Sequence, residues 1–251
     1  MPKFFVSSDQ IEGEKVTIIG EDVNHIINVL RLKIDDNIVI GNKQSGVTYN
    51  TKIAEILKEK VICKIKNINE NSSESNVKVS VFQGLPKADK MEYIIQKCTE
   101  LGAVEFVPVA LKRSIVKLNG KDEAKKIDRW QKIAEVAAKQ SGRDIIPQVK
   151  NVLNVKDLVE MISKFDLFII AYEAEKENSL KTILQKNREN ILKKNEPKIG
   201  IVIGPEGGLD LEEVNVLKEN GAEIITLGNR ILRTETAPIA IVSNIMYEFE
   251  S

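Results

Sequence analysis

The stretch KIGIVIGPEGG (198–208) joins a run of β-branched residues to a glycine-rich turn. Such a run followed by Gly predicts a buried strand that ends in a tight turn. A second stretch, EIITLGNRILRTETAP (223–238), repeats the order of strand, glycine and loop before Pro238 begins a helix. Parallel strands of an α/β fold end along one edge of their sheet, where such folds bind ligands. We therefore expect both loops to lie at the same edge.

A polar stretch, NENSSESN (69–76), separates two regions of different pattern. Before it, short β-branched runs between turn residues predict a small β-barrel with strands near 15–19, 37–41, 47–56 and 61–68 and one helix over 20–33 with Asp22 as its N-cap. After it, strands near 77–85, 104–111, 166–172, 198–204 and 223–228 alternate with helices over 89–103, 124–142 and 238–249. This alternation predicts an α/β fold with a parallel sheet. We expect domains at 1–72 and 77–251, joined by a linker at 73–76.

Length and composition limit the class of protein. A chain of 251 residues with 42% hydrophobic and 29% charged residues is typical of a soluble globular protein. No apolar run approaches the roughly 20 residues that a membrane-spanning helix needs. The start, MPKFFVSSDQ, lacks the pattern of a secretory signal. We therefore expect a cytoplasmic protein without a membrane partner.

Few residues are suited to metal or nucleophilic chemistry. Cys63 and Cys98 are far apart in the sequence, and His25 is the only histidine. A zinc site of the usual kind cannot be assembled from these residues, so we expect no metal. A Ser-His-Asp or Cys-His mechanism would have to use His25. Both cysteines are expected to be unreactive thiols in the core.

Charge is balanced overall but not along the chain. The formal net charge of zero argues against a simple polyanion binder. Residues 77–160, however, contain 16 basic and 11 acidic side chains, whereas 161–251 contain 11 and 15. This basic middle indicates either a local patch for a polyanion or a solvated helix face, and composition does not distinguish them.

The loop GPEGG (204–208) has features that oppose a phosphate site. It matches neither common phosphate-binding glycine pattern, and Glu206 would repel a pyrophosphate. Adjacent glycines let the backbone approach a ligand closely. A ligand that is neutral or cationic near the loop fits better, and S-adenosylmethionine qualifies. An ordinary turn between strand and helix is the alternative.

The second loop adds charged groups. It places Arg230, Arg233 and Glu235 in a short stretch before the last helix. Guanidinium groups bind phosphate or stabilise a developing negative charge on oxygen. The two loops together therefore predict a ligand pocket with a chemical role.

Six segments in order along the chain resemble the RsmE family of 16S rRNA (uracil-N3) methyltransferases, a SPOUT-class family. These are VNHIINVLRLKIDDNI (23–38), QKCTELGAVEFVPV (96–109), KRS (112–114), AAKQSGR (137–143), IGPEGGL (203–209) and LGNRILRTETA (227–237). The resemblance implies a PUA-like RNA-binding barrel at 1–72 and a trefoil-knotted methyltransferase domain at 77–251. It also implies a homodimer that acts on 16S rRNA of the small ribosomal subunit. Knots are otherwise nearly absent from proteins, so only the resemblance predicts one.

The resemblance also assigns residues to the S-adenosylmethionine pocket. These are Tyr172, Ile203, Gly204, Gly207, Gly208, Leu227, Gly228, Ile231, Leu232, Thr236 and Ala237. Tyr172 is the weakest of these candidates.

Methylation at N3 of uracil requires loss of the N3 proton while charge spreads onto the neighbouring carbonyl oxygens. We expect Arg233 to stabilise that charge and Glu235 or Glu206 to accept the proton. An ion pair with Arg233, or a capping role, is an equal alternative for Glu235.

The RNA contacts are expected from arginines and lysines outside the pocket. Arg31, Lys33, Arg113 and Arg143 are the candidates, because Arg suits phosphate contacts and base stacking. For Lys87 and Lys90, exposure to solvent without a specific role is at least as good an interpretation. Two other hypotheses remain: a knotted methyltransferase for another RNA such as tRNA, and an inactive ribosome-associated RNA-binding protein.

Overall fold

The computed structural model describes residues 1–70 and 73–250, which form two compact units. The first unit comprises Met1–Glu74 and Ala138–Ile146, and the second comprises Ser75–Ala137 and Pro147–Ser251. The pattern along the chain grouped 138–146 with the second region, but tertiary contacts join this segment to the first. Residues 71 and 72 of the expected boundary stretch lie outside the described residues.

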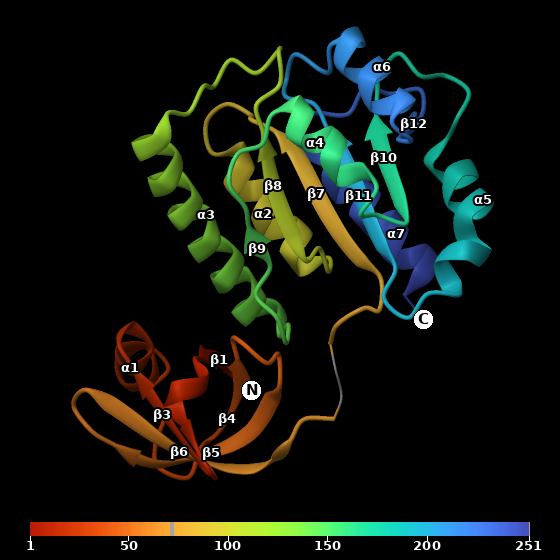
Figure 1. The fold of residues 1–251 in the computed structure, drawn as a ribbon. Coiled ribbons are helices and arrows are strands. Elements are labelled where there is room, and N and C mark those ends of the chain that lie inside the picture. The colour runs from red at the N-terminus through yellow and green to blue at the C-terminus, as the bar shows by residue number, and fades with distance from the viewer. Residues whose placement is uncertain (71–72, 251) are drawn as a thin grey trace. The chain divides into compact units, whose positions relative to one another are not determined.

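The sheet of the first unit has the strand order β1-β4-β5-β6-β3-β2 (Figure 1). Its strands are β1 (Lys3–Val6), β2 (Ile11–Glu12), β3 (Lys15–Ile19), β4 (Asn37–Asn42), β5 (Thr48–Ile56) and β6 (Lys60–Ile68). β1 and β4 are parallel, and the other neighbours are antiparallel. The four strands predicted in this region are confirmed. β1 and β2 were not predicted, because they are short and β1 is buried throughout rather than alternating.

The single helix expected over 20–33 is wrong in length and in its cap. α1 (Glu21–Asn24) is one turn long and continues into the π-helical turn η2 (His25–Val29). Gly20, with φ of 75°, precedes the helix, and Asp22 lies inside it. The chain leaves the helix at Arg31, which has φ of 53°. A left-handed residue cannot continue a right-handed helix, so the helix ends early.

Buried charges attach the segment Ala138–Ile146 to the first unit. Lys3 Nζ lies 2.6 Å from Asp144 Oδ1, and the Thr48 hydroxyl donates to the same oxygen at 2.7 Å. Burial by itself raises the pKa of Asp144, but the bonds from Lys3, Thr48 and the Ser73 amide outweigh it and lower the pKa to about 2. A buried carboxylate held by several donors stays ionised and fixes the segment in place.

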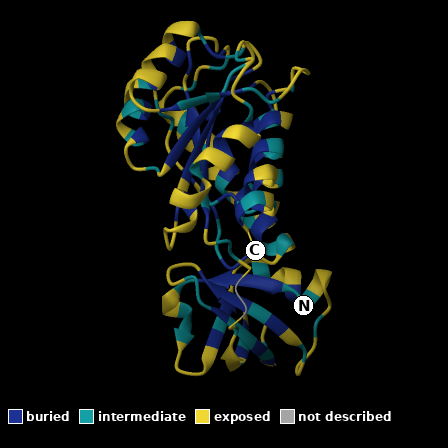
Figure 2. Cartoon of the chain, turned by 90° about the vertical axis from the view of Figure 1, so that its right-hand side faces the viewer, coloured by how far each residue is buried: buried dark blue, intermediate teal, exposed yellow. Residues whose placement is uncertain are grey.

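The second unit contains a parallel sheet with the order β12-β10-β11-β7-β8-β9. Its strands are β7 (Lys78–Gly84), β8 (Glu105–Val109), β9 (Gln148–Val149), β10 (Leu167–Ala171), β11 (Lys198–Ile203) and β12 (Glu223–Ile225). The predicted α/β class with parallel strands is confirmed. The continuous Ile and Val runs reflect strands that are buried on both faces, as the dark blue strands in Figure 2 show.

Helices cover both faces of this sheet. They are α2 (Lys90–Glu100), α3 (Gly120–Ser141), α4 (Val155–Ile162), α5 (Leu180–Leu192), α6 (Leu211–Glu219) and α7 (Thr236–Phe249). In Figure 1, α4 lies in front of the sheet, whereas α2 and α7 lie behind it. One core cluster joins Phe82 and Phe168 of the strands to Leu158 of α4 and Leu217 of α6.

The order of the strands reverses between β7 and β11. From β7 the chain proceeds through β8 to β9 on one side, while β11, β10 and β12 lie on the other. The last paired residues here are Gln83 and Ile203. In open α/β sheets, the carboxyl ends of the strands at such a reversal form a crevice that binds ligands.

Two further expectations concern the cysteines and the membrane. Cys63 and Cys98 are both buried free thiols, as predicted. Burial raises the pKa of Cys63 to about 12 and raises that of Cys98 as well, so neither thiol ionises near neutral pH. Within residues 1–70 and 73–250, no helix has both the length and the apolarity for a membrane crossing.

Candidate functional site

The carboxyl ends of β10, β11 and β12 surround a cavity of about 560 Å³. Three loops, at 171–173, 203–208 and 226–234, supply most of its wall, and Lys90, Lys176 and Ala237 complete it. The volume lies within the range of small-molecule sites. The two glycine-turned loops therefore meet at one sheet edge, as the sequence predicted.

The structure brings together ten of the eleven residues that the sequence analysis assigned to a cofactor. Lining the cavity are Tyr172, Ile203, Gly204, Gly207, Gly208, Leu227, Gly228, Ile231, Leu232 and Ala237. Thr236 does not line it. This residue begins α7, and its amide donates to the carbonyl of Arg233 at 2.9 Å.

Glycines allow the GPEGG loop to fold back on itself. The Gly208 amide donates to the Pro205 carbonyl at 2.9 Å, and Gly208 has a φ of 70°. A Cβ on Gly208 would overlap Glu173 Oε1, and one on Gly204 would lie 2.8 Å from the carbonyl carbon of Gly208. Side chains at these positions would therefore fill or distort the cavity wall.

A buried polar cluster joins the two loops to the end of β7. The Thr234 hydroxyl donates to the Gly204 carbonyl at 2.7 Å and accepts from Gln83 Nε2 at 2.9 Å. Gln83 is fully buried, and Thr234 is 7% exposed. Buried polar groups of this kind specify one arrangement, because leaving them without partners is unfavourable.

The outer side of the GPEGG loop is held by Arg113. Its guanidinium donates to the Gly207 carbonyl at 3.2 Å and lies 3.6 Å from Asp210. Asp210 also caps α6 and forms a reciprocal capping box with Glu213. The acidic first turn of α6, with Glu212 and Glu213, therefore supports the helix that follows the loop.

Lys90 joins the two carboxylates that were candidates for accepting a proton. Its Nζ lies 3.0 Å from Glu206 Oε1 and 3.1 Å from Glu235 Oε2. The Lys87 amide donates to the same Glu206 oxygen at 3.1 Å. Partial burial raises the pKa of Glu206, but the bonds from Lys90 and Lys87 outweigh it and lower the pKa below its usual value. The hydrogen bond to Glu206 raises the pKa of Lys90, so this site contains a fixed ammonium group.

Arg233 points mostly into solvent at the rim of the cavity. Its side chain is 82% exposed, and its Nη1 lies 3.9 Å from Glu235 Oε1. This pair is longer than the Lys90–Glu235 pair at 3.1 Å. Arg230 also lines the cavity and is exposed. Both guanidinium groups can therefore reorient toward an anionic ligand.

The four arginines and lysines expected to contact RNA have different environments. Arg31 and Lys33 are exposed in the first unit, and Arg113 braces the GPEGG loop while remaining partly exposed. Arg143 is 3% exposed, and its Nε donates to Glu74 at 3.2 Å. This enclosed ion pair is a correction to the RNA contact expected for Arg143, because its guanidinium is occupied inside the first unit.

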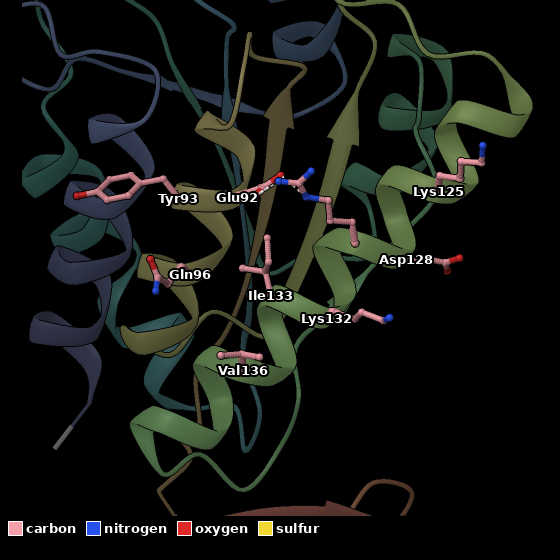
Figure 3. A pocket seen from close by; sticks show the side chains of 9 residues that line it. Glu92, Tyr93, Gln96, Lys125, Asp128, Lys132, Ile133 and Val136 are labelled. Carbon is pink, nitrogen blue, oxygen red and sulfur yellow. Dashed lines mark hydrogen bonds and ion pairs between the residues drawn. The ribbon is translucent and has the colours of Figure 1, made fainter. Parts of the chain in front are cut away.

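A second concavity, of about 740 Å³, lies between α2 and α3 (Figure 3). Its lining includes Gln96 on α2 and Ile133 and Val136 on α3, which Figure 3 labels. The Arg129 guanidinium crosses it to Glu92, with Nε 2.7 Å from Oε1. No strand ends here and no loops converge, so the cavity between the three loops is the stronger candidate site.

Sequence reasoning missed several residues of the site, three of which lie against the glycine loops. Gln83, Lys90 and Glu173 contact the glycine loops from other elements. Only Lys90 carries a local signal, since a lysine in the first turn of a helix opposes the helix dipole. That unfavourable position indicates a compensating partner, which the structure shows to be a pair of carboxylates.

Two family models match the chain and define its class. A model described as an RNA methyltransferase domain matches residues 73–246, and one described as an RNA methyltransferase PUA domain matches residues 18–66. The first covers the parallel sheet and all three cavity loops. The fold and the site are thus those of an RNA methyltransferase.

Similar proteins show which family of RNA methyltransferases the chain belongs to. The ribosomal RNA small subunit methyltransferase E of Bacillus subtilis (strain 168) is 39% identical, over 100% of this chain and 98% of the relative. That of Mesomycoplasma hyopneumoniae (strain 232) is 33% identical, over 97% and 98%. A solved ribosomal RNA small subunit methyltransferase E from Neisseria gonorrhoeae, bound to S-adenosyl methionine, aligns with a TM-score of 0.83 at 30% identity, covering 98% of this chain and 97% of that one. The chain belongs to the ribosomal RNA small subunit methyltransferase E family.

Proposed function

We propose that this protein transfers a methyl group from S-adenosylmethionine to N3 of a specific uridine in 16S rRNA of the small ribosomal subunit. The observation that carries the proposal is the cavity at the ends of β10, β11 and β12, formed largely by the GPEGG loop and the loop at 226–234. Such a substrate agrees with a cytoplasmic protein.

The residues around the cavity fit S-adenosylmethionine. The GPEGG loop offers bare backbone at Gly204, Gly207 and Gly208, which can approach an adenine and a ribose. The Glu206 carboxylate is paired with Lys90, whereas Glu173 lines the cavity beside Gly208 and offers a carboxylate to a sulfonium cation. The neighbouring structure from Neisseria gonorrhoeae, which is bound to S-adenosyl methionine, supports this assignment.

The mechanism assigns separate roles to Arg233 and Glu235. S-adenosylmethionine, when bound, supplies the electrophilic methyl group. The exposed Arg233 guanidinium can move to the uracil carbonyl oxygens and stabilise the charge that develops there. Glu235 accepts the N3 proton. Lys90 binds both carboxylates, but Glu206 is the poorer acceptor, because it also accepts from the Lys87 amide and its pKa is lowered.

Substitutions at these positions test the mechanism. Arg233→Ala should lower turnover at least a hundredfold, while S-adenosylmethionine affinity stays within about tenfold, since the guanidinium acts on the transition state. Retained activity would remove Arg233 from the mechanism. Glu235→Gln should slow the chemical step more than Glu206→Gln does in single-turnover assays. The opposite order would transfer the role of proton acceptor to Glu206.

The substrate assignment has a direct test. Small subunits from cells that lack this protein should accept label from methyl-tritiated S-adenosylmethionine, and mass spectrometry of their 16S rRNA should locate one N3-methyluridine. Bulk tRNA should not accept label. Labelled tRNA with unlabelled small subunits would indicate a methyltransferase for another RNA, and no transfer to either would favour an inactive RNA-binding protein.

For RNA contacts we retain Arg31, Lys33 and Arg113. The first two lie within residues 18–66, which the PUA model matches, and Arg113 lies beside the GPEGG loop. Arg31→Ala should weaken rRNA binding and reduce its salt dependence without changing cofactor affinity. An unchanged salt slope would exclude this phosphate contact.

We also propose that the second unit contains a trefoil knot and that the first sheet closes as a PUA-like barrel. Support for the knot comes from Thr234, which is bonded to the Gly204 carbonyl and to Gln83, so that the last loop packs tightly against the GPEGG loop and β7. A crystallographic chain trace in which the C-terminus can be withdrawn without passing through a loop would contradict it.

We further propose that the protein forms a homodimer. Tyr93 on α2 and Tyr247 on α7 are 49% and 88% exposed, although the two helices pack side by side. Large apolar side chains on adjacent helices are typical of a protein interface. Tyr247→Glu should convert a dimer into monomers in sedimentation experiments. A monomeric wild-type protein at micromolar concentration would refute the proposal.

A further inference from the structure

Lys90 has a position that its own helix disfavours. It is the first residue of α2, where the helix dipole presents partial positive charge. Its side chain is nevertheless only 30% exposed. A cation at this end of a helix needs compensation by anions from elsewhere in the fold.

The compensating anions come from two different loops. Glu206 belongs to the GPEGG loop and Glu235 to the loop after β12, and the Lys90 ammonium lies 3.0 Å and 3.1 Å from their carboxylates. Glu235 occupies the N-cap position of α7, but its side chain makes no capping hydrogen bond there. It is directed to Lys90 instead. Without the Lys90 ammonium group between them, the two carboxylates would repel each other.

Of the residues that the structure describes, no other cation forms an ion pair with both Glu206 and Glu235. Arg233 lies 3.9 Å from Glu235 and is largely exposed. Lys87 contributes its backbone amide to Glu206, whereas its side chain is exposed. Among the described residues, Lys90 is the cation that lies within 3.1 Å of both carboxylates.

We infer that Lys90 is a positioning residue that clamps the GPEGG loop and the loop after β12 together, and that this clamp fixes Glu235 at the start of α7, beside the cavity wall. Lys90 acts through the two carboxylates and holds both loops against the start of α2. The role of Glu235 as proton acceptor rests on the proposed function, whereas the clamp itself does not.

Hydrogen exchange of the protein without cofactor tests the clamp. In Lys90→Met, amide exchange in segments 204–208 and 233–237 should become about tenfold faster, because two partly exposed ion pairs are lost together. Lys97→Met is the matched control, since Lys97 lies on the same helix, has 34% of its side chain exposed, and pairs with Glu100 on the surface. It should leave both segments unchanged. Lys90→Arg should restore most of the protection.

A double-mutant cycle shows whether Lys90 acts through the carboxylates. In the Glu206→Gln, Glu235→Gln background, adding Lys90→Met should change exchange by less than about twofold, because the interaction is already absent. Single Glu206→Gln should loosen segment 204–208 even if Lys90→Met does not fold. Wild-type exchange rates in Lys90→Met, or an undiminished effect in the double-glutamine background, would overturn the inference.

Calorimetry separates this inference from the proposed function. If the wild-type protein binds S-adenosylmethionine, Lys90→Met should weaken the affinity about tenfold and Lys90→Arg should recover it. An unchanged affinity together with faster exchange would overturn the link between the clamp and the cavity. A wild-type protein that shows no heat of binding would refute the proposed function, while the exchange experiment would still decide the clamp.

Discussion

Removal of one buried hydroxyl should loosen the whole cavity. Thr234→Val keeps the shape of the side chain but deletes the oxygen that donates to the Gly204 carbonyl at 2.7 Å and accepts from Gln83 at 2.9 Å. Both partners retain some compensation, because Gln83 Nε2 also contacts the carbonyls of Gly84 at 2.9 Å and Gly204 at 3.4 Å. Two net hydrogen bonds of about 1 kcal/mol each therefore predict a loss of about 2 kcal/mol in the free energy of unfolding.

Thermal unfolding measures this loss. About 2 kcal/mol corresponds to a decrease in Tm of roughly 4–8 °C for a chain of this size. S-adenosylmethionine affinity, measured by calorimetry, should fall roughly fivefold, because the Gly204 wall is no longer tied to the second loop.

The matched control is Thr182→Val. The Thr182 hydroxyl lies on the surface, 2.8 Å from Ser179 Oγ, so its removal should change stability by less than about 0.5 kcal/mol. A Thr234→Val protein with the Tm and the cofactor affinity of this control would refute the reasoning that the buried cluster organises the cavity.

Two further predictions address the GPEGG loop and the acid limit of stability. Gly204→Ala should weaken S-adenosylmethionine binding at least tenfold by calorimetry, because its Cβ would lie 2.8 Å from the backbone carbon of Gly208 and 3.0 Å from the Leu209 nitrogen, neither of which can move freely; wild-type affinity would contradict this. For Asp144, the pKa is lowered from 3.8 to about 2 in the folded protein, so its contribution is present above pH 4 and is lost as the pH falls toward 2. Urea unfolding should show a contribution of about 2 kcal/mol that disappears in this range and is absent from Asp144→Asn; an equal acid dependence in both proteins would exclude Asp144 as its source.

The sheet of the second unit was predictable because its signals are local. Runs such as IGIVI are buried on both faces of a parallel sheet, and glycines follow two of the runs where the chain must turn. The prediction of one helix over 20–33 was wrong because it also rested on a local pattern alone. Its apolar spacing favoured a long helix, but the π-helical turn and the left-handed Arg31 end it after η2.

Charged residues were the least predictable part of the site. Arg143 suited RNA by residue type, yet it is buried against Glu74, which lies 69 positions earlier. Lys90 looked like a solvated surface residue, yet it joins Glu206 and Glu235. The type of a residue indicates what its side chain can bind. For Arg143 and Lys90, the neighbouring sequence does not identify which residue is the partner.

The sequence by itself determined the α/β pattern, the two glycine-turned loops and the absence of a common phosphate-binding motif, because periodicity and turn chemistry act between neighbours in the chain. Only the tertiary structure decided that Ala138–Ile146 belongs to the first unit and that one ammonium group holds both cavity carboxylates. The Lys87 amide and Glu206 are 119 positions apart. Contacts over such separations depend on how strands and helices pack. They produce no periodic pattern of residues that could be recognised in a single sequence.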